Sequence, residues 1–176
     1  MKTFAAAGTI LLSMATAVGS FVGWQTYNVG ATGISIELPM KPEPMQLDVP
    51  EGMRNQVQSF ENFLSATNDL AVIVSRMDYT SANPNLNGAA DGAIQRLQLN
   101  PGFSAKRLER KPFKLGSLSA MYIYVEYSMQ GGSLIHHQVL AIKGKTLWQV
   151  VVTYDATAAA RGADAKRILD SIKIKG

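Results

Sequence analysis

The chain has 176 residues and a formal net charge of +4, and 47% of the residues are hydrophobic against 17% charged. This composition is typical of a single globular domain and excludes a disordered chain. The absence of cysteine excludes disulfides, thiol nucleophiles and cysteine-ligated metals. The charge is uneven: residues 18–105 hold four basic and eight acidic residues, whereas residues 106–176 hold twelve and five.

The N-terminal residues are typical of a secretory signal peptide. Met1-Lys2 is followed by an uncharged, apolar run from Phe4 to Val18, and Ala15-Thr16-Ala17 is a small-residue cleavage site. We therefore predict that residues 1–17 are a signal peptide and that residues 18–176 form one domain. The mature protein would then be exported to the periplasm or the extracellular space.

Two alternatives stay open for this segment. Cleavage after Gly19 or Ser20 would also follow small residues. In addition, weakly apolar residues continue to Trp24, and a run of about 20 such residues can span a bilayer. An uncleaved N-terminal anchor is therefore the second alternative.

The first half of the domain is expected to contain short strands. Residues 25–32 are polar, and the first expected strand follows them. Ile34 to Leu38 alternates apolar and polar residues, and the prolines of residues 41–52 predict a loop after it. Gln56–Leu64 and Leu70–Met77 are rich in β-branched and aromatic residues, which predicts two strands joined by a polar turn.

A helix is expected after this hairpin. Asn83-Pro84-Asn85 opens it, and Asn100-Pro101-Gly102 ends it. Its apolar face has helical spacing and consists of Leu86, Ala90, Ala93, Ile94 and Leu97. Ser104 to Lys114 is then predicted as a strand, and a turn at Gly116 follows.

Three consecutive strands dominate the second half of the chain. They are Ala120–Tyr127, Leu134–Ile142 and Thr146–Tyr154, and all are dense in β-branched, aromatic and other apolar residues. The turns between them contain Gly131-Gly132 and Gly144, which tolerate the positive φ of tight hairpins.

The chain is expected to close with an alanine-rich helix. Asp155 or Thr157 can cap its N-terminus, because both side chains accept hydrogen bonds from backbone N–H groups. Ile168, Leu169 and Ile172 would form its apolar face.

The second hairpin fixes which side chains share a face of the sheet. A two-residue Gly144-Lys145 turn pairs Lys143 with Thr146, and side chains alternate between faces. One face then holds Ile135, His137, Val139, Ala141, Trp148, Val150, Val152 and Tyr154. Because the opposite face is apolar too, helices should cover both faces. The expected fold class is α+β, an antiparallel β-sheet covered by helices in an αβα sandwich.

The register of the first hairpin is open. A two-residue turn at Gly131-Gly132 places Tyr122, Tyr124 and Glu126 on the face of Trp148, whereas a three-residue turn moves them to the opposite face. We favour the two-residue turn.

This order of elements resembles the PsbP-like superfamily, which also contains Ran-binding Mog-type proteins and many exported bacterial proteins. The residues that carry the resemblance are Gly33–Pro39, the Gly116 turn, Leu147–Val152 and the closing Ile168–Ile172. The resemblance implies an αβα sandwich around an antiparallel sheet. It also implies a non-enzymatic binding or assembly role, and it supplies no functional residues that match a motif here.

Enzymatic motifs are not evident in the sequence. His136 and His137 are neighbours on a strand and point to opposite faces, so they cannot hold one metal ion together. A triad with Ser117 or Ser133 as nucleophile lacks the G-x-S-x-G motif, and no G-x-G-x-x-G or Walker loop is present. We predict no enzymatic activity, no metal and no cofactor.

Five basic residues form the first candidate binding site: Lys106, Arg107, Arg110, Lys111 and Lys114. Such a cluster can meet an acidic protein or an anionic membrane surface. Export and the lack of interleaved aromatic residues argue against nucleic acid. The commoner explanation of such a row is a solvated edge strand, on which lysines discourage aggregation.

The second candidate group is Tyr122, Tyr124 and Glu126 near one of the histidines. These side chains could orient a ligand in a pocket, or they could be core tyrosines with satisfied hydroxyl groups. The predicted function is an exported, non-enzymatic binding or assembly module that acts on a protein or a membrane-associated complex outside the cytoplasm. The alternative is a carrier of a small apolar ligand between sheet and helix.

Overall fold

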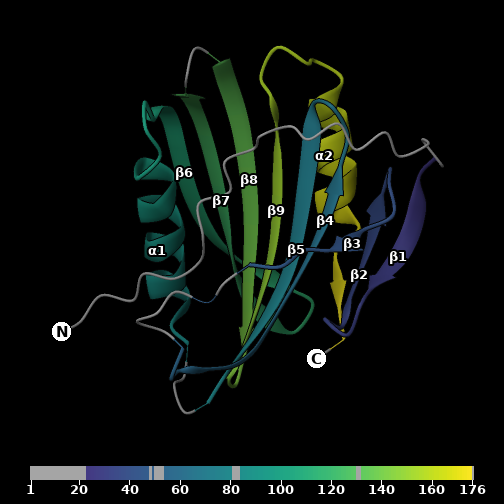
Figure 1. The fold of residues 1–176 in the computed structure, drawn as a ribbon, viewed down its shortest axis with the longest axis vertical. Coiled ribbons are helices and arrows are strands. Elements are labelled where there is room, and N and C mark those ends of the chain that lie inside the picture. The colour runs from purple at the N-terminus through teal and green to yellow at the C-terminus, as the bar shows by residue number, and fades with distance from the viewer. Residues whose placement is uncertain (1–22, 48, 50–53, 81–83, 130–131, 176) are drawn as a thin grey trace.

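The computed structural model describes residues 23–47, 49, 54–80, 84–129 and 132–175. These residues form two antiparallel β-sheets and two α-helices (Figure 1). The predicted signal peptide and most of the alternative anchor lie outside the described residues. Within the described ranges, no helix is both long enough and apolar enough to cross a membrane.

The larger sheet has seven strands, and every neighbouring pair is antiparallel. Its spatial order is β3 (Glu43–Pro44), β4 (Val57–Ala66), β5 (Leu70–Tyr79), β9 (Thr146–Asp155), β8 (Gly132–Lys143), β7 (Leu118–Met129) and β6 (Ser104–Leu115). The strand formed by the basic candidate residues, β6, is thus the last strand of the sheet.

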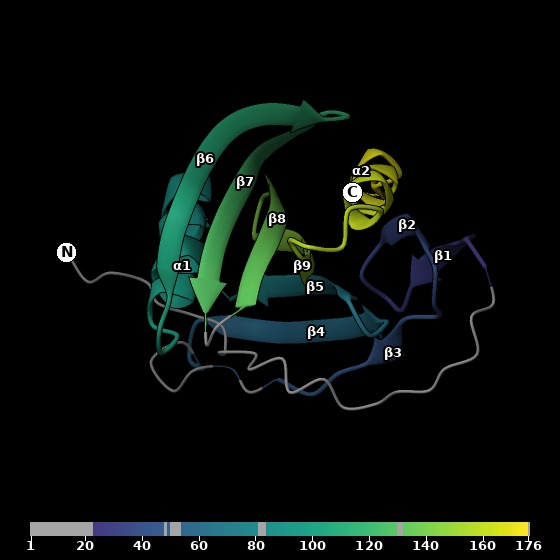
Figure 2. The same ribbon diagram turned by 90° about the horizontal axis from the view of Figure 1, so that it is seen from above.

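A smaller sheet and two helices cover the larger one. The smaller sheet has the order β1 (Gln25–Val29), β2 (Ile34–Leu38) and β10 (Lys173–Ile174). The helices are α1 (Leu86–Gln98) and α2 (Arg161–Asp170). Helix α1 contacts β7 and β8, whereas α2 contacts β2 and β9. Figure 2 shows α2 together with β1 and β2, apart from α1, which lies beside β6 and β7.

Two apolar clusters lie on opposite faces of the larger sheet, as the two-faced strands predicted. Val150 and Val152 of β9 pack with Ile168 of α2 and with the buried residues of β2. On the other face, Ile123 of β7 and Leu140 of β8 pack with Ala90 of α1. The predicted α+β sandwich is therefore confirmed, and burial of apolar area on both faces stabilises it.

The predicted pairing of β8 with β9 is confirmed, since Lys143 lies opposite Thr146. In the first hairpin Tyr124 lies opposite His137, so the tyrosines are on the face of Trp148, as expected. The predicted two-residue turn at Gly131-Gly132 is wrong, because Gly132 is paired with Met129. A shift of this pairing by two residues keeps every side chain on its face.

Three other local predictions are wrong. Residues 41–52 were predicted as a loop, but the two-residue strand β3 lies within them. The polar segment that starts at Gln25 contains strand β1, whose side chains are mostly exposed because it is the edge of the small sheet. Neither Asp155 nor Thr157 caps α2, which begins after Ala160 without a side-chain cap. Instead the Asp155 carboxylate accepts a hydrogen bond from the backbone N–H of Thr157 at 2.8 Å, in the turn before the helix.

Candidate functional site

The outer strands of the larger sheet bring together residues from both candidate groups. Arg107 lies opposite Glu126, Glu109 opposite Tyr124, and Lys111 opposite Tyr122. Because paired residues share a face, these six side chains lie on the same side as His137. We call the surface formed by Arg107, Glu109, Lys111, Tyr122, Tyr124, Glu126 and His137 the tyrosine–histidine face.

His137 is the centre of this face. Its Nδ1 is 2.7 Å from the hydroxyl oxygen of Tyr122, and its Nε2 is 3.4 Å from that of Tyr154. The ring of Tyr124 meets the imidazole edge-on, with 5.2 Å between ring centroids. A neutral imidazole accepts a hydrogen bond at one nitrogen and donates one at the other. Tyr122, His137 and Tyr154 therefore form one hydrogen-bonded row.

Burial keeps this row uncharged at neutral pH. It lowers the pKa of His137 to about 4, because the imidazolium would lose hydration. Burial also raises the pKa of Tyr122 to about 12, and the negative charge of Glu109 adds to this shift. The pKa of Tyr154 is likewise raised by burial.

A row of charges on β6 lies beside these neutral groups. Glu109 forms ion pairs with Arg107 and with Lys111, the latter at 2.5 Å. Hydrogen bonds from Lys111 and Arg107 lower the pKa of the Glu109 carboxyl. The Arg107 side chain is 63% exposed and that of Lys111 66%, so both stay open to solvent. The Arg107 guanidinium also lies 5.3 Å from the centre of the Tyr124 ring, within cation–π range.

The other three predicted basic residues have other partners. Arg110 and Lys114 lie on the α1 side of β6, because side chains alternate along the strand. Arg110 pairs with Asp91 of α1 at 2.5 Å, and Lys114 donates a hydrogen bond to Ser119. Lys106 lies at an irregularity in the β6–β7 pairing, and its ammonium group donates a hydrogen bond to the Ser133 hydroxyl group at 2.9 Å. The five residues therefore line one edge but divide between its two faces.

His136 lies on the opposite face of the sheet from His137, as predicted. It is buried, its Nε2 lies 3.2 Å from the Gln138 amide oxygen, and its Nδ1 lies 3.1 Å from the Thr153 hydroxyl oxygen. Burial lowers its pKa to about 4. In the described part of the chain, no group of three or more His, Asp or Glu side chains could hold a metal ion.

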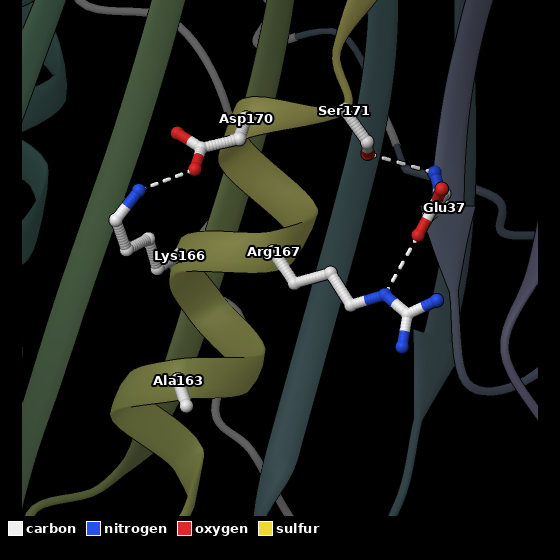
Figure 3. Close-up of a pocket in the computed structure, with 6 residues that line it drawn as sticks. All are labelled: Glu37, Ala163, Lys166, Arg167, Asp170 and Ser171. Carbon is white, nitrogen blue, oxygen red and sulfur yellow. Dashed lines mark hydrogen bonds and ion pairs between the residues drawn. The ribbon is translucent and has the colours of Figure 1, made fainter.

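A separate hollow of about 490 Å³ lies where α2 meets β2 (Figure 3). Its lining consists of Glu37, Ala163, Lys166, Arg167, Asp170 and Ser171. The charges pair with one another, because Arg167 binds Glu37 at 2.7 Å and Lys166 binds Asp170. The backbone N–H of Glu37 also donates to the hydroxyl group of Ser171 (Figure 3). These contacts join α2 to β2, so the hollow is explained by the packing of the two elements.

Glu109 and Tyr154 were not predicted from the sequence as site residues. A period-two pattern along β6 would have placed Glu109 between Arg107 and Lys111 on one face. Tyr154 was predicted on the face of His137, but its contact with the imidazole depends on the register of β8 against β9.

Comparison with known proteins rests on structure alone, since no protein-family model and no curated protein matches this chain. Cyanobacterial PsbP (CyanoP) from Synechocystis sp. PCC 6803 is similar, with a TM-score of 0.58, 10% identity, 93% of this chain covered and 99% of that one. LpqN of Mycobacterium tuberculosis, which is involved in cell envelope biogenesis, has a TM-score of 0.50, 17% identity and coverage of 87% and 91%. The chain has a PsbP-like fold.

Proposed function

We propose that the protein is an exported, non-catalytic binding module that docks through the tyrosine–histidine face onto a protein or a membrane-associated complex outside the cytoplasm. One observation carries this proposal: exposed Arg107 and Lys111 border the half-buried rings of Tyr122 and Tyr124. Tyr and Arg are the residues that most often dominate binding energy at protein interfaces.

The geometry favours binding over acid–base catalysis. General acid–base catalysis needs groups whose pKa lies near the working pH. Burial moves the pKa of His137 down to about 4 and that of Tyr122 up to about 12, away from neutrality in both directions. The hydrogen bonds of Tyr122 and Tyr154 to His137 hold these rings in place. A partner that binds there would therefore lose little side-chain entropy by ordering the rings.

Two observations support a site of action outside the cytoplasm. The apolar run and small-residue cleavage site of residues 1–17 match a secretory signal. The similar LpqN structure belongs to a protein of cell envelope biogenesis. Together they favour an accessory protein of the cell envelope.

Photo-crosslinking in the native host tests the proposal. Replacing Phe113 by p-benzoylphenylalanine places the crosslinker on the same side of β6 as Arg107 and Lys111, at a side chain that is 37% exposed. The matched control is the same replacement at Leu99, which follows α1 and is 75% exposed. We expect an envelope protein to be captured from position 113 and not from position 99.

Neutralising the basic residues of β6 is a second, independent test of the proposed function. One variant carries Gln at Lys106, Arg107, Arg110, Lys111 and Lys114, and its control carries Gln at five exposed lysines elsewhere, Lys41, Lys143, Lys166, Lys173 and Lys175. The partner should be lost from the first variant and kept by the second. Capture of the same proteins from positions 99 and 113, or equal losses in the two charge variants, would refute the proposal.

A further inference from the structure

The edge strand β6 has one side that no strand of the described part of the chain pairs with. It spans 12 residues, pairs with β7 on one side and ends the sheet on the other (Figure 1). The opposite margin differs, because the two-residue strand β3 pairs with part of β4. A long free edge presents backbone N–H and C=O groups that another extended chain can use.

The turn at the end of β6 shows which backbone groups point outward. Leu115 and Leu118 flank a two-residue turn, and such a flanking pair is hydrogen-bonded. Pairs alternate along an antiparallel ladder, so Phe113, Lys111 and Glu109 direct their backbone groups to β7. Residues 108, 110, 112 and 114 therefore direct theirs to the free side.

Pro112 is consistent with this assignment. Proline has no N–H group, and within sheets it is found where that group would face solvent. Leu108, Arg110 and Lys114 then supply outward N–H donors, while all four outward residues supply carbonyl acceptors. The single proline removes one donor and leaves the rest of the edge able to pair.

The side chains along this edge define the chemistry of a partner. Five of them are basic (Lys106, Arg107, Arg110, Lys111 and Lys114), against the single acidic residue Glu109. Two of the large apolar side chains that are exposed in the described residues also lie on β6, Leu108 at 42% and Phe113 at 37%. They lie on opposite faces of the strand, so each face offers a basic and an apolar contact.

A second copy of this chain does not fit the edge. Pairing β6 with another β6 would place like charges opposite one another, which destabilises a strand pair. An acidic segment in extended conformation has the complementary charge. The basic residues thus oppose self-association and favour acidic strands at the same edge.

We propose that β6 binds an extended, acidic segment of the partner protein as an eighth strand of the sheet. This inference rests on the proposed function, and it adds the mode of recognition and the chemistry of the partner. The tyrosine–histidine face would then contact the side chains that this added strand presents on its own side.

Amide NMR with a defined peptide tests the pairing. The probe is a short synthetic peptide with blocked ends in which pairs of Glu alternate with pairs of Val, and its control has Lys in place of Glu. We expect the amide protons of Leu108, Arg110 and Lys114 to exchange with solvent quickly in the free protein and slowly with the acidic peptide. The Lys peptide should cause no protection. Binding without protection of these amides, or equal effects of both peptides, would overturn the inference.

A pair of variants separates main-chain pairing from charge attraction. Lys114→Ala and Lys114→Pro both remove the ammonium group, but only the second removes an outward N–H group. Loss of one hydrogen bond corresponds to about fivefold weaker binding of the acidic peptide by Lys114→Pro than by Lys114→Ala. The same comparison at Leu108 repeats the test if Lys114→Pro does not fold. Equal affinity of the folded Ala and Pro variants would contradict strand addition.

These outcomes distinguish the two proposals. If the native partner is captured from position 113 while the peptide protects no outward amide, the protein is a binding module that does not use its edge. If the peptide pairs with β6 while the envelope yields no partner, the edge chemistry is correct and the proposed function fails.

Discussion

The hydroxyl group of Tyr122 is the nearest polar partner of His137, at 2.7 Å. Replacing Tyr122 by Phe keeps the ring but leaves the Nδ1 of a half-buried imidazole without this partner. An unsatisfied buried group of this kind costs about 1–3 kcal/mol. We therefore expect Tyr122→Phe to lower the free energy of unfolding by that amount, as measured by urea unfolding at pH 7.

Tyr124→Phe is the matched control for this measurement. It removes a hydroxyl group from the same face and the same strand but keeps the edge-on contact of the ring with His137. We expect a change of less than about 0.5 kcal/mol, the usual range for a side chain without a special role. If the two variants lose equal stability, the hydrogen bond to His137 has no structural importance.

The two histidines make the stability of the protein depend on pH. Both have a folded-state pKa of about 4, below the ordinary value near 6.5. Between these values the unfolded chain binds more protons than the folded one, so stability is complete above pH 6.5 and falls as pH decreases towards 4. Each histidine contributes a slope of at most about 1.4 kcal/mol per pH unit.

Replacing His137 by Gln tests this pH dependence. Urea unfolding at several values between about pH 4 and 6.5 should show a smaller slope for His137→Gln than for the wild-type protein, because one titrating group is removed. The slope that His136 causes should remain. An unchanged slope would mean that His137 titrates at the same pH in the folded and unfolded chains.

The sequence predicts part of the candidate site and misses another part. Alternation along β7 and β8, together with the favoured two-residue turn, predicts Tyr122 and Tyr124 on the side of His137, and the structure confirms this. The division of the basic residues between two faces was not anticipated, because a count of charges ignores the alternation of side chains in a strand. The pairing of Arg110 with Asp91 could not be predicted either, since it depends on how α1 lies against the sheet.

At the scale of elements, the β1–β2 turn packs closely against Phe63 of β4. Gly30 in this turn has φ +49°, and a Cβ there would lie 2.1 Å from Cζ of Phe63 in β4. Gly116 has a similar φ of +60° but has open space around it. Changing either glycine to Ala should lower the free energy of unfolding by about 1–2 kcal/mol, because of the left-handed backbone conformation. At Gly30 only, overpacking against Phe63 should lower it by about 1–3 kcal/mol more.

Thermal or urea unfolding of Gly30→Ala and Gly116→Ala measures this difference. The backbone penalty is common to both variants. The additional loss of unfolding free energy in Gly30→Ala therefore measures how tightly the turn packs against Phe63. Equal losses would show that the Phe63 ring moves aside and that the small sheet is loosely attached.

The long strands and the helix α1 follow from local patterns, whereas the small sheet does not. Strands β4, β5, β7, β8 and β9 carry β-branched and aromatic residues over many positions, and Asn85 caps α1 as its position predicts. Strand β1 is polar because only Val29 of its five residues is buried. Strand β10 has two residues and pairs with β2, which lies far away in the sequence. Such short, exposed strands exist through tertiary pairing, which leaves no periodicity to detect.

At the scale of the whole molecule, the acidic and basic halves of the sequence supply opposite sides of the larger sheet. Residues before Lys106 supply the adjacent strands β3, β4 and β5 and most of the acidic groups, whereas later residues supply β9, β8, β7 and nearly all of β6. The helices partly offset this separation, since Asp91 of α1 reaches Arg110 on β6. The free edge still keeps more basic than acidic groups, so the field at this margin should attract an acidic partner.

This charge layout predicts how salt affects binding. Exposed charges are screened over about 10 Å at 0.1 M salt, so raising NaCl from about 50 to about 300 mM should slow association of the acidic peptide several-fold. Stopped-flow or surface-based kinetics should show most of the change in the association rate, because dissociation breaks short-range contacts. The variant neutralised at the five β6 residues should lose this salt dependence, and the control variant neutralised at five lysines elsewhere should keep most of it. A salt effect of equal size in both variants would mean that attraction comes from the net charge of the molecule, and the basic edge would then have no directing role.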